Sequence, residues 1–258
     1  MLMQRVLEPE VMDTVEDAAT YDAMDHSAVN DLFIARLKAL GVAGLCLDIG
    51  CGPGHIPLQL VTECPEVDVV ALDLSKNMLL VALEHQKKCA NGEQVEFVHA
   101  DAKGLGSDDH SFDSVFSNSI LHHIPEPIDF LREAWRVLKP GGMLLIRDLF
   151  RPDSEERARE LVAMYAGEES QHAQDLFYDS LCAALRPDEL DALAKEIGIR
   201  KVNGAKISEI LTMLNKDFIK WVAIAFVLAC PVAYYAMNKW LENFAYKTSL
   251  SWWIFALS

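Results

Sequence analysis

The chain has 258 residues, 51% of them hydrophobic and 24% charged, and a formal net charge of −16. This composition is that of a globular protein with ample core material, which excludes an intrinsically disordered chain. Residues 195–258 carry eight Lys/Arg against four Asp/Glu, so the charge divides into −20 before residue 195 and +4 from there on. An acidic body argues against binding to DNA or RNA, because phosphate contacts need clustered basic side chains. A small or neutral substrate is favoured.

The N-terminus and the six cysteines bear on location and on metal content. The first residues lack the long apolar core of a secretory signal, which predicts a cytoplasmic body. The cysteines form no Cys-x-x-Cys pair, so their spacing predicts neither a zinc site nor a disulfide scaffold. We therefore expect reduced thiols and no bound metal.

The first element predicted along the chain is a helix from Ser27 to about Leu40, with Ser27 as its N-cap. It is preceded by an acidic and polar stretch that contains Tyr21. Apolar side chains recur in the helix at near-helical spacing, at Val29, Leu32, Phe33, Ala35 and Leu37. Such a helix either covers the edge of a pocket or simply packs on a sheet, with Tyr21 at the surface.

A short buried strand followed by a glycine-rich turn is predicted at residues 45–55, which read LCLDIGCGPGH. Glycine lets such a turn adopt backbone angles that other residues avoid, and it lets a ligand approach the main chain. Helix-compatible sequence follows at residues 56–61. This arrangement can cradle a nucleotide, although a glycine-rich turn can also be only a tight connection between two elements.

Four further strands alternate with helical stretches. They are expected at residues 67–73, 95–100, 111–118 and 143–148, the last of them after a turn at residues 139–142. Ser75 is expected to cap a helix that runs to about Cys89. Strands separated by helices of this length pair in parallel through right-handed crossovers, with helices on both faces. The predicted fold class is α/β, with a doubly wound, mostly parallel, Rossmann-like sheet.

Acidic residues lie at the carboxyl ends of these strands, where doubly wound sheets bind their ligands. Asp73 can accept hydrogen bonds from both hydroxyls of an adenosine ribose. Asp101 can accept one from an adenine amino group while the Ala102 amide donates to the ring. Asp48 and the amides of the glycine turn would face a polar amino-acid end of the ligand. Each acid alone is equally well explained as a solvated carboxylate or a helix cap, but an ordered series is not.

These segments resemble the class I S-adenosylmethionine-dependent methyltransferases over about residues 20–190. The resemblance is carried by residues 47–55, 71–75, 99–102, 112–124 and 138–142. It implies S-adenosyl-L-methionine as the cofactor, with Tyr21 closing over its methionine end. The other implied cofactor contacts are Asp48, Gly50, Cys51, Gly52, Asp73, Met78, Asp101, Ala102 and Asn118.

Two other nucleotide-binding motifs fit the glycine turn less well. A nicotinamide or flavin site has the fingerprint Gly-x-Gly-x-x-Gly, whereas the third glycine here comes one residue earlier and Asp48 precedes the turn. A P-loop ends in Gly-Lys-Ser/Thr, which is absent from this turn. The sequence therefore favours a methyl donor over a dinucleotide or a nucleoside triphosphate.

The acceptor is expected to bind after the fourth and fifth strands. His122 and His123 follow the fourth strand, where a histidine can take a proton from a hydroxyl or amine acceptor. The alternative is that they only hydrogen-bond the cofactor or the backbone. A helical insertion at residues 149–186 either builds the acceptor pocket or forms two amphipathic helices that pack on the sheet. The candidate substrate contacts are Asp148, Arg151 and Tyr178.

Composition changes near residue 195, and the remaining tail follows a different pattern. Residues 221–237 are an uncharged run of 17 residues, the short end of what spans a bilayer. Basic residues are more frequent before this run than after it, which would keep the body in the cytoplasm. Residues 218–258 are therefore a candidate contact with the inner face of the cytoplasmic membrane. The alternative is a buried C-terminal hairpin.

The tail also resembles a fragment of the FtsX-like ABC-transporter permease family, over about residues 195–258. We therefore expect a methyltransferase domain at 1–194 and a permease-like tail at 195–258, joined as in a chimeric reading frame. Class I methyltransferases usually finish their sheet with a sixth strand and an antiparallel seventh. Only residues 199–202 are strand-like here, so the edge of the sheet is expected to be incomplete.

The sequence as a whole predicts an enzyme that transfers a methyl group from S-adenosyl-L-methionine to a small-molecule acceptor. Two alternatives stay open. One is a cofactor-binding module without transfer activity, and the other is a membrane-attached interaction protein whose tail is the functional part.

Overall fold

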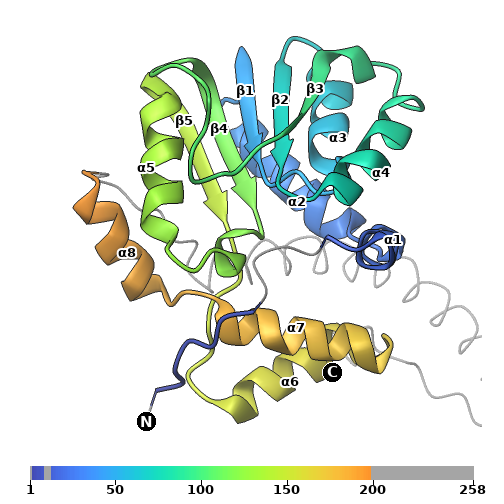
Figure 1. The fold of residues 1–258 in the computed structure, drawn as a ribbon, viewed down its shortest axis with the longest axis vertical. Helices are drawn as coiled ribbons and strands as arrows, with labels where there is room; N and C mark the ends of the chain where they lie inside the picture. The colour runs from blue at the N-terminus through green and yellow to red at the C-terminus, as the bar shows by residue number, and fades with distance from the viewer. Residues whose placement is uncertain (1, 9–12, 199–258) are drawn as a thin grey trace, which may run out of the picture. The chain divides into compact units, whose positions relative to one another are not determined.

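The computed structural model describes residues 2–8 and 13–198, which belong to one compact unit. At its centre is a five-stranded parallel sheet in the order β3-β2-β1-β4-β5 (Figure 1). Its strands are β1 Leu45–Ile49, β2 Asp68–Asp73, β3 Val95–His99, β4 Phe112–Asn118 and β5 Leu138–Arg147. The order reverses between β1 and β4, which makes the carboxyl ends of these strands the expected ligand edge.

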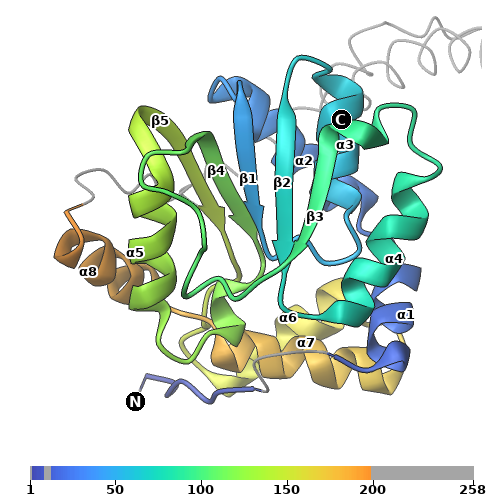
Figure 2. The ribbon, with the colours of Figure 1, turned by 45° about the horizontal axis from the view of Figure 1, so that its top comes forward.

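Helices cover both faces of the sheet, as Figure 2 shows, and the predicted doubly wound α/β fold is confirmed. The helices are α1 Val15–Ala23, α2 Ser27–Ala39, α3 His55–Glu63, α4 Lys76–Gln86, α5 Pro127–Val137, α6 Glu155–Tyr165, α7 Gln171–Ala183 and α8 Pro187–Glu196, with 3₁₀ turns η1 Gly92–Gln94 and η2 Leu121–His123. One core cluster joins the sheet to α2 and α3, and a second joins its other face to α5.

The position of strand β1 inside the sheet, between β2 and β4, explains why its sequence is an almost unbroken apolar run. Successive side chains point to opposite faces, so Cys46 enters the first cluster while Leu47 and Ile49 enter the second. A parallel strand buried on both faces has no solvent side and needs apolar residues throughout. Asp48 is the exception within this buried strand, and it lies next to the ligand edge.

Two details of helix α2 differ from the prediction. Its N-cap is His26 rather than Ser27, and the Ser27 amide donates to Asp25 Oδ1 at 3.0 Å. Of the predicted apolar positions, Phe33 and Leu37 are buried, whereas Val29, Leu32 and Ala35 are exposed, because the buried stripe also contains Asn30 and Ile34. The stripe faces the sheet, so the helix packs on the core along nearly its whole length.

The fifth strand also begins earlier than predicted. It starts at Leu138, which pairs with Phe112, and a register shift between Phe112 and Ser114 absorbs the predicted turn into the strand. Gly141 takes a φ of +82° within this irregular stretch, a conformation that glycine allows. The predicted cap of α4 is confirmed, because Ser75 Oγ accepts a hydrogen bond from the Met78 amide.

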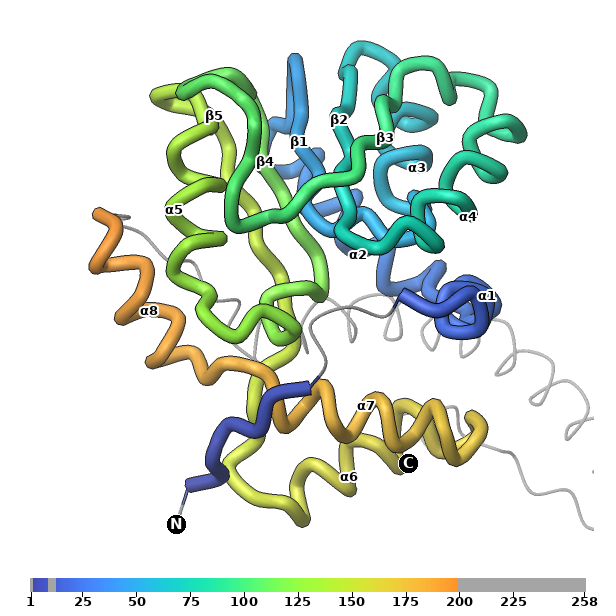
Figure 3. The backbone as a smooth tube through the Cα atoms, in the orientation of Figure 1, coloured from blue at the N-terminus to red at the C-terminus, as the bar shows by residue number. Residues whose placement is uncertain are grey.

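Helices α6 and α7 pack on each other across the end of the sheet at which β4 and β5 finish, with the N-terminal segment (residues 2–8) alongside α7 (Figure 3). A small separate cluster of Ala158, Val162 and Leu181 holds the pair together. The insertion is thus two helices, and they cover the ligand edge rather than a face of the sheet.

Residues 199–258 lie outside the described residues, and with them the permease-like tail beyond its first four residues, the run at 221–237 and the strand-like residues 199–202. In the part that is described, no helix combines the length and apolar character needed to cross a membrane. Helix α8 runs through the predicted domain boundary at residue 194, and Leu190, Leu193 and Ile197 pack on the second core cluster.

Candidate functional site

The glycine loop between β1 and α3 (residues 50–54) is fastened to the end of β2. The amides of Gly50 and Cys51 donate to the Leu72 carbonyl at 2.8 and 2.9 Å. The Gly52 amide donates to Asp73 Oδ2 at 2.7 Å. These amides were expected to face the ligand; in the structure all three donate to the end of β2, and their contact with a cofactor remains a prediction. Buried N–H groups require acceptors, and the end of the neighbouring strand supplies them.

Two glycines of this loop have different surroundings. Gly50 has a φ of +76°, and a Cβ there would lie 2.3 Å from Ile120 Cγ2, so the loop packs directly on the residues that follow β4. Gly52 has a φ of +53°, and a Cβ there would meet only Tyr21, at 4.0 Å, among the described residues. The main chain at Gly52 therefore has room beside it for a ligand.

Asp73, the predicted ribose contact, is well placed but already partly engaged. Its Oδ1 accepts from the Ser75 amide at 2.8 Å and its Oδ2 accepts from Gly52. Burial raises the pKa of Asp73, while these two amides oppose the rise. Each carboxylate oxygen has a further lone pair, so both remain able to accept from ribose hydroxyls.

Asp48 is a buried carboxyl with one oxygen left open. Its side chain is 1% exposed, and its Oδ2 has no hydrogen-bond partner among the described residues. Burial, and then the negative charge of Asp73, raises the pKa of Asp48 well above its ordinary value. A buried polar atom of this kind is costly unless a partner is supplied. A donor group of a ligand would supply it.

The three residues expected on the adenine side occupy different environments. Met78 is buried in the first turn of α4, and Ala102 is partly buried against the second core cluster. Asp101 is half-exposed, and its Oδ1 accepts from the Lys103 amide at 2.9 Å and pairs with Lys103 Nζ at 3.1 Å. Their contact with adenine remains a prediction.

Arg147, the last residue of β5, is a candidate that sequence analysis missed. Its Nε donates to Asn118 Oδ1 at 2.7 Å, and its guanidinium lies 4.7 Å from the Phe33 ring centroid. Burial lowers the pKa of Arg147 to about 10, and Tyr21 is near enough to interact with its charge. Asn118, a predicted cofactor contact, instead turns its oxygen toward Arg147. The sequence feature that could have identified Arg147 is a single arginine at the end of a predicted strand.

This guanidinium has no carboxylate partner within residues 2–8 and 13–198. Arg147 also donates to the Val29 carbonyl at 3.1 Å, so it is held in place by neutral groups only. Tyr21 is partly buried, lies close to Gly52 and interacts electrostatically with Arg147, and burial raises the pKa of its hydroxyl. A fixed cation beside an open main chain suits a carboxylate ligand.

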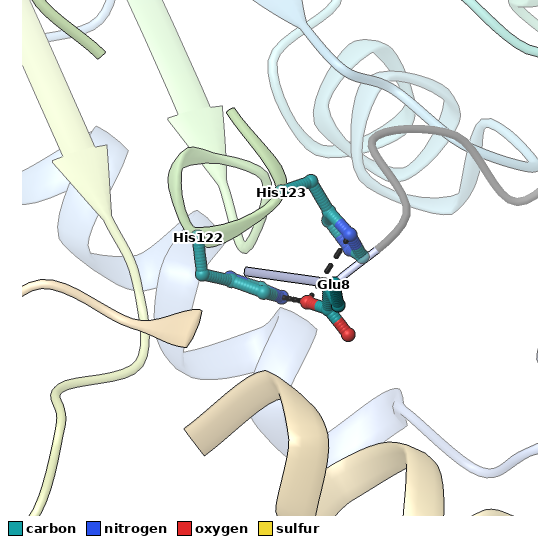
Figure 4. Close-up of side chains that lie close together, drawn as sticks. All are labelled: Glu8, His122 and His123. Carbon is teal, nitrogen blue, oxygen red and sulfur yellow. Dashed lines mark ion pairs between the residues drawn. The ribbon is translucent and has the colours of Figure 1, made fainter. Parts of the chain in front are cut away.

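His122 and His123 lie in η2, and both rings turn toward Glu8 of the N-terminal segment (Figure 4). Asp148 Oδ1 lies 2.5 Å from His122 Nδ1, and Asp148 Oδ2 accepts from the His122 amide at 3.1 Å. The single atom Glu8 Oε1 lies 3.6 Å from His122 Nε2 and 3.2 Å from His123 Nδ1. Burial lowers the pKa of His122, but the hydrogen bond to Asp148 and the negative charges of Asp148 and Glu8 together outweigh it, and the net shift is upward.

The N-terminal segment is held over η2 by Arg5. Its Nε donates to the Ala183 carbonyl at 2.6 Å, and its two terminal nitrogens donate to the carbonyls of Pro125 and Ile124 at 3.0 and 2.9 Å. These bonds connect the segment to α7 and to the residues after η2. They bring Glu8 to the histidines from far away in the sequence, where no local pattern could indicate it.

The three predicted substrate contacts lie in different surroundings. Asp148 contacts His122. Arg151 is 3% exposed, donates to the carbonyls of Met3 and Ala184, and pairs with Glu189, so each nitrogen of its guanidinium already has a partner within the protein. Arg151 is therefore a structural residue that fastens the N-terminal segment to α7 and α8.

Tyr178 lines a cavity of about 700 Å³ between residues 2–8, the start of α6 and α7. Its lining includes Glu8 and Cys182 but none of the predicted cofactor contacts. The cavity and the glycine loop thus lie in different places, and the cavity leads to the Glu8 cluster. Tyr178 remains a candidate contact for whatever enters there.

A second group of two histidines and a carboxylate borders the glycine loop. His55 Nε2 lies 2.9 Å from Asp22 Oδ1, and His85 Nε2 lies 3.4 Å from Asp22 Oδ2. His85 Nδ1 also lies 2.9 Å from the Pro53 carbonyl oxygen. The group ties α1, which contains Tyr21, to α3 and α4 beside the loop.

Comparison with known proteins agrees with this architecture. Residues 47–146 match the family model described as a methyltransferase domain. The chain is 40% identical over 108 residues to demethylmenaquinone methyltransferase of Listeria welshimeri, covering 42% of this chain and 45% of the relative. It is 33% identical over 135 residues to 27-O-demethylrifamycin SV methyltransferase of Amycolatopsis mediterranei, covering 50% and 49%. The chain thus spans about half the length of these relatives.

A solved structure extends the similarity to the three-dimensional fold. Phosphoethanolamine N-methyltransferase 2 of Haemonchus contortus, in complex with S-adenosyl-L-methionine, is 25% identical with a TM-score of 0.55. The match covers 72% of this chain and 41% of that one. The sheet and its helices therefore have the Rossmann-like fold of class I methyltransferases.

Proposed function

We propose that this chain, whose residues 47–146 form a methyltransferase domain, transfers a methyl group from S-adenosyl-L-methionine to a small-molecule acceptor. The observation that carries the proposal is Asp48, a buried carboxyl with an open oxygen, set beside Asp73 at the ligand edge of the sheet. When bound, S-adenosyl-L-methionine supplies a methyl group on a sulfonium, which is already an activated electrophile.

The described residues fit that cofactor from end to end. Asp73 would accept from the ribose hydroxyls, and Asp48 would accept from the ammonium of the methionine portion. Arg147 would pair with the carboxylate beside it, under Tyr21. Gly50 and Cys51 serve indirectly, because their amides hold the loop so that Gly52 can meet the ligand. The adenine would lie between Met78, Asp101 and Ala102.

Alignment of the acceptor and exclusion of water are the tasks left to the protein. Helices α6 and α7 and the N-terminal segment cover the ligand edge next to η2, so the acceptor side is enclosed by these elements. His122 and His123 would contact the acceptor there. The curated relatives are named for demethylmenaquinone and 27-O-demethylrifamycin SV, which supports an organic small molecule as the acceptor class.

Calorimetric titration of the full chain with S-adenosyl-L-methionine tests the cofactor assignment. We expect saturable binding that Asp73→Ala weakens by about 10- to 100-fold, since hydrogen bonds to a charged group contribute about 1.5–3 kcal/mol. Asp68→Ala is the matched control, because Asp68 begins the same strand at its opposite, exposed end. Absence of binding by folded protein would refute the proposal.

Transfer itself is tested by mass spectrometry of a panel of hydroxyl and amine acceptors incubated with the full chain and the methyl donor. A methylated product, absent from the Asp73→Ala reaction, is the expected result. Tight cofactor binding with no transfer to any acceptor would contradict the enzymatic part and leave a cofactor-binding module.

A further inference from the structure

We infer that Glu8, His122 and His123 form a binding site for one divalent transition-metal ion such as Zn²⁺. The cysteine spacing led us to expect no metal, and the cofactor assignment needs none. The inference concerns atoms that the fold brings together from the N-terminal segment and η2 (Figure 4).

The separations between the three ligand atoms suit a shared ion. Glu8 Oε1 lies 3.2 Å from His123 Nδ1 and 3.6 Å from His122 Nε2, and all three atoms lie within 4.8 Å of one another. Ligands held about 2.0–2.2 Å from a tetrahedral Zn²⁺ lie roughly 3.4 Å apart. Little movement would be needed to place an ion among them.

The supporting contacts are those that metal-binding histidines usually have. The Nδ1 of His122 faces Asp148 at 2.5 Å, which leaves its Nε2 directed at Glu8. A carboxylate on the far nitrogen of a ligating histidine fixes the ring and makes it a better ligand. Ser180 Oγ donates to Glu8 Oε2 at 3.2 Å, so the other carboxylate oxygen, Oε1, points at the histidines.

Glu8 itself is the observation that points to an ion. Its side chain is 8% exposed, and Oε1 has no hydrogen-bond partner in the described part of the chain. The cavity beside Tyr178 reaches Glu8 and gives an ion a route to the site.

The donor set decides the class of ion. Two imidazole nitrogens and one carboxylate oxygen suit Zn²⁺, Co²⁺ or Fe²⁺, whereas Ca²⁺ and Mg²⁺ prefer oxygen ligands. Three protein ligands leave at least one coordination position open. If the proposed methyl transfer is correct, an acceptor hydroxyl could occupy that position and lose its proton to solvent more readily.

The Asp22 group offers the same residue types but a poorer arrangement. Its two histidines contact different oxygens of Asp22, and His85 is also engaged by the Pro53 carbonyl. Asp22 Oδ1, like Glu8 Oε1, has no hydrogen-bond partner among the described residues, but the Asp22 side chain is 26% exposed. All three of its residues are partly exposed. It therefore serves as an internal comparison for the Glu8 site.

The test uses the full chain, freed of metal with a chelator and titrated with ZnCl₂ by calorimetry and with CoCl₂ by visible absorption. We expect one equivalent to bind, and His123→Ala or Glu8→Ala to weaken binding at least about tenfold, with Asp148→Asn weakening it about 10- to 100-fold through His122. His172→Ala, at an exposed position of α7, should bind as the unchanged chain does. Circular dichroism confirms that each variant is folded.

Two results would overturn the inference. One is the absence of saturable one-to-one binding by the folded, chelator-treated chain, which would make the cluster an ion pair between Glu8 and charged histidines. The other is binding that His55→Ala abolishes and His123→Ala leaves intact. Titration of the chelated chain with S-adenosyl-L-methionine separates this inference from the proposed function, because cofactor binding should persist without metal.

Discussion

The cofactor side of the ligand edge and the histidine side are assembled in different ways. On the cofactor side, the glycine loop, Asp48 and Asp73 all lie within residues 48–75. Their hydrogen bonds join the loop to the end of the neighbouring strand β2. Around η2, Glu8, His122 and Asp148 come from three distant segments; Arg5 fastens the first to the residues after η2, and Asp148 is bonded directly to His122. The first side is thus part of the sheet, whereas the second depends on a separable N-terminal segment. The two should therefore respond independently to substitution.

The largest loss of stability is expected from Gly50→Ala, because Gly50 of the glycine loop packs against Ile120, the residue that precedes η2. The new Cβ would lie 2.3 Å from Ile120 Cγ2 at a φ of +76°. Left-handed strain and overpacking together predict a loss of about 2–5 kcal/mol of unfolding free energy, measured by urea denaturation. Gly104→Ala is the control, since a Cβ there meets nothing within 4 Å.

Ile120→Ala in the Gly50→Ala background sharpens this prediction. Removal of the clashing side chain should restore part of the lost stability, because only the backbone strain then remains. If the double variant is less stable by the full sum of the two single changes, the packing explanation is wrong.

Arg5→Ala should disturb the histidine side alone. It removes the hydrogen bonds to the carbonyls of Ala183, Pro125 and Ile124. The free energy that holds the N-terminal segment in place should therefore fall by about 2–3 kcal/mol. Zn²⁺ affinity should fall with it, while affinity for S-adenosyl-L-methionine stays within about twofold of the unchanged chain, a difference well under 1 kcal/mol. Both are read by calorimetry, with the exposed Gln4→Ala as control. Equal losses of both affinities would show that the two sides are not independent.

Asp48→Asn should disturb the cofactor side alone, with the smallest change in stability. Burial raises the folded-state pKa of Asp48, so the stability that its neutral form contributes is present below the unfolded pKa and is lost as pH rises through the folded pKa. The variant should then be about 1–2 kcal/mol more stable than the unchanged chain at neutral pH, with the gap closing as pH falls.

Denaturation across the pH range in which the chain stays folded measures that gap, with Asp68→Asn as the exposed control. Cofactor affinity should fall in Asp48→Asn, because an ammonium group of the ligand would lose its charged partner. A variant that is less stable than the unchanged chain at neutral pH would contradict the view of Asp48 as an unsatisfied carboxyl.

Local patterns made the sheet and the cofactor side predictable. The almost unbroken apolar run of β1, the glycines after it and the cap at Ser75 each follow from short-range sequence, and all appear in the structure. The exact role of the loop amides did not follow, because the acceptors for Gly50 and Cys51 lie on the next strand. Likewise, Leu138 joined β5 because Phe112 was available to pair with it.

The sequence by itself determined the fold class, the strand ends and the acids Asp48 and Asp73 along the ligand edge. Only the tertiary structure decided that Glu8 meets the histidines and that Arg147 is a half-buried cation with no carboxylate partner in the described part of the chain. It also decided that Arg151 is enclosed rather than available to a substrate. The physical reason is range: strand and turn patterns act over a few residues, whereas a buried charge is defined by partners that only folding brings within hydrogen-bond distance.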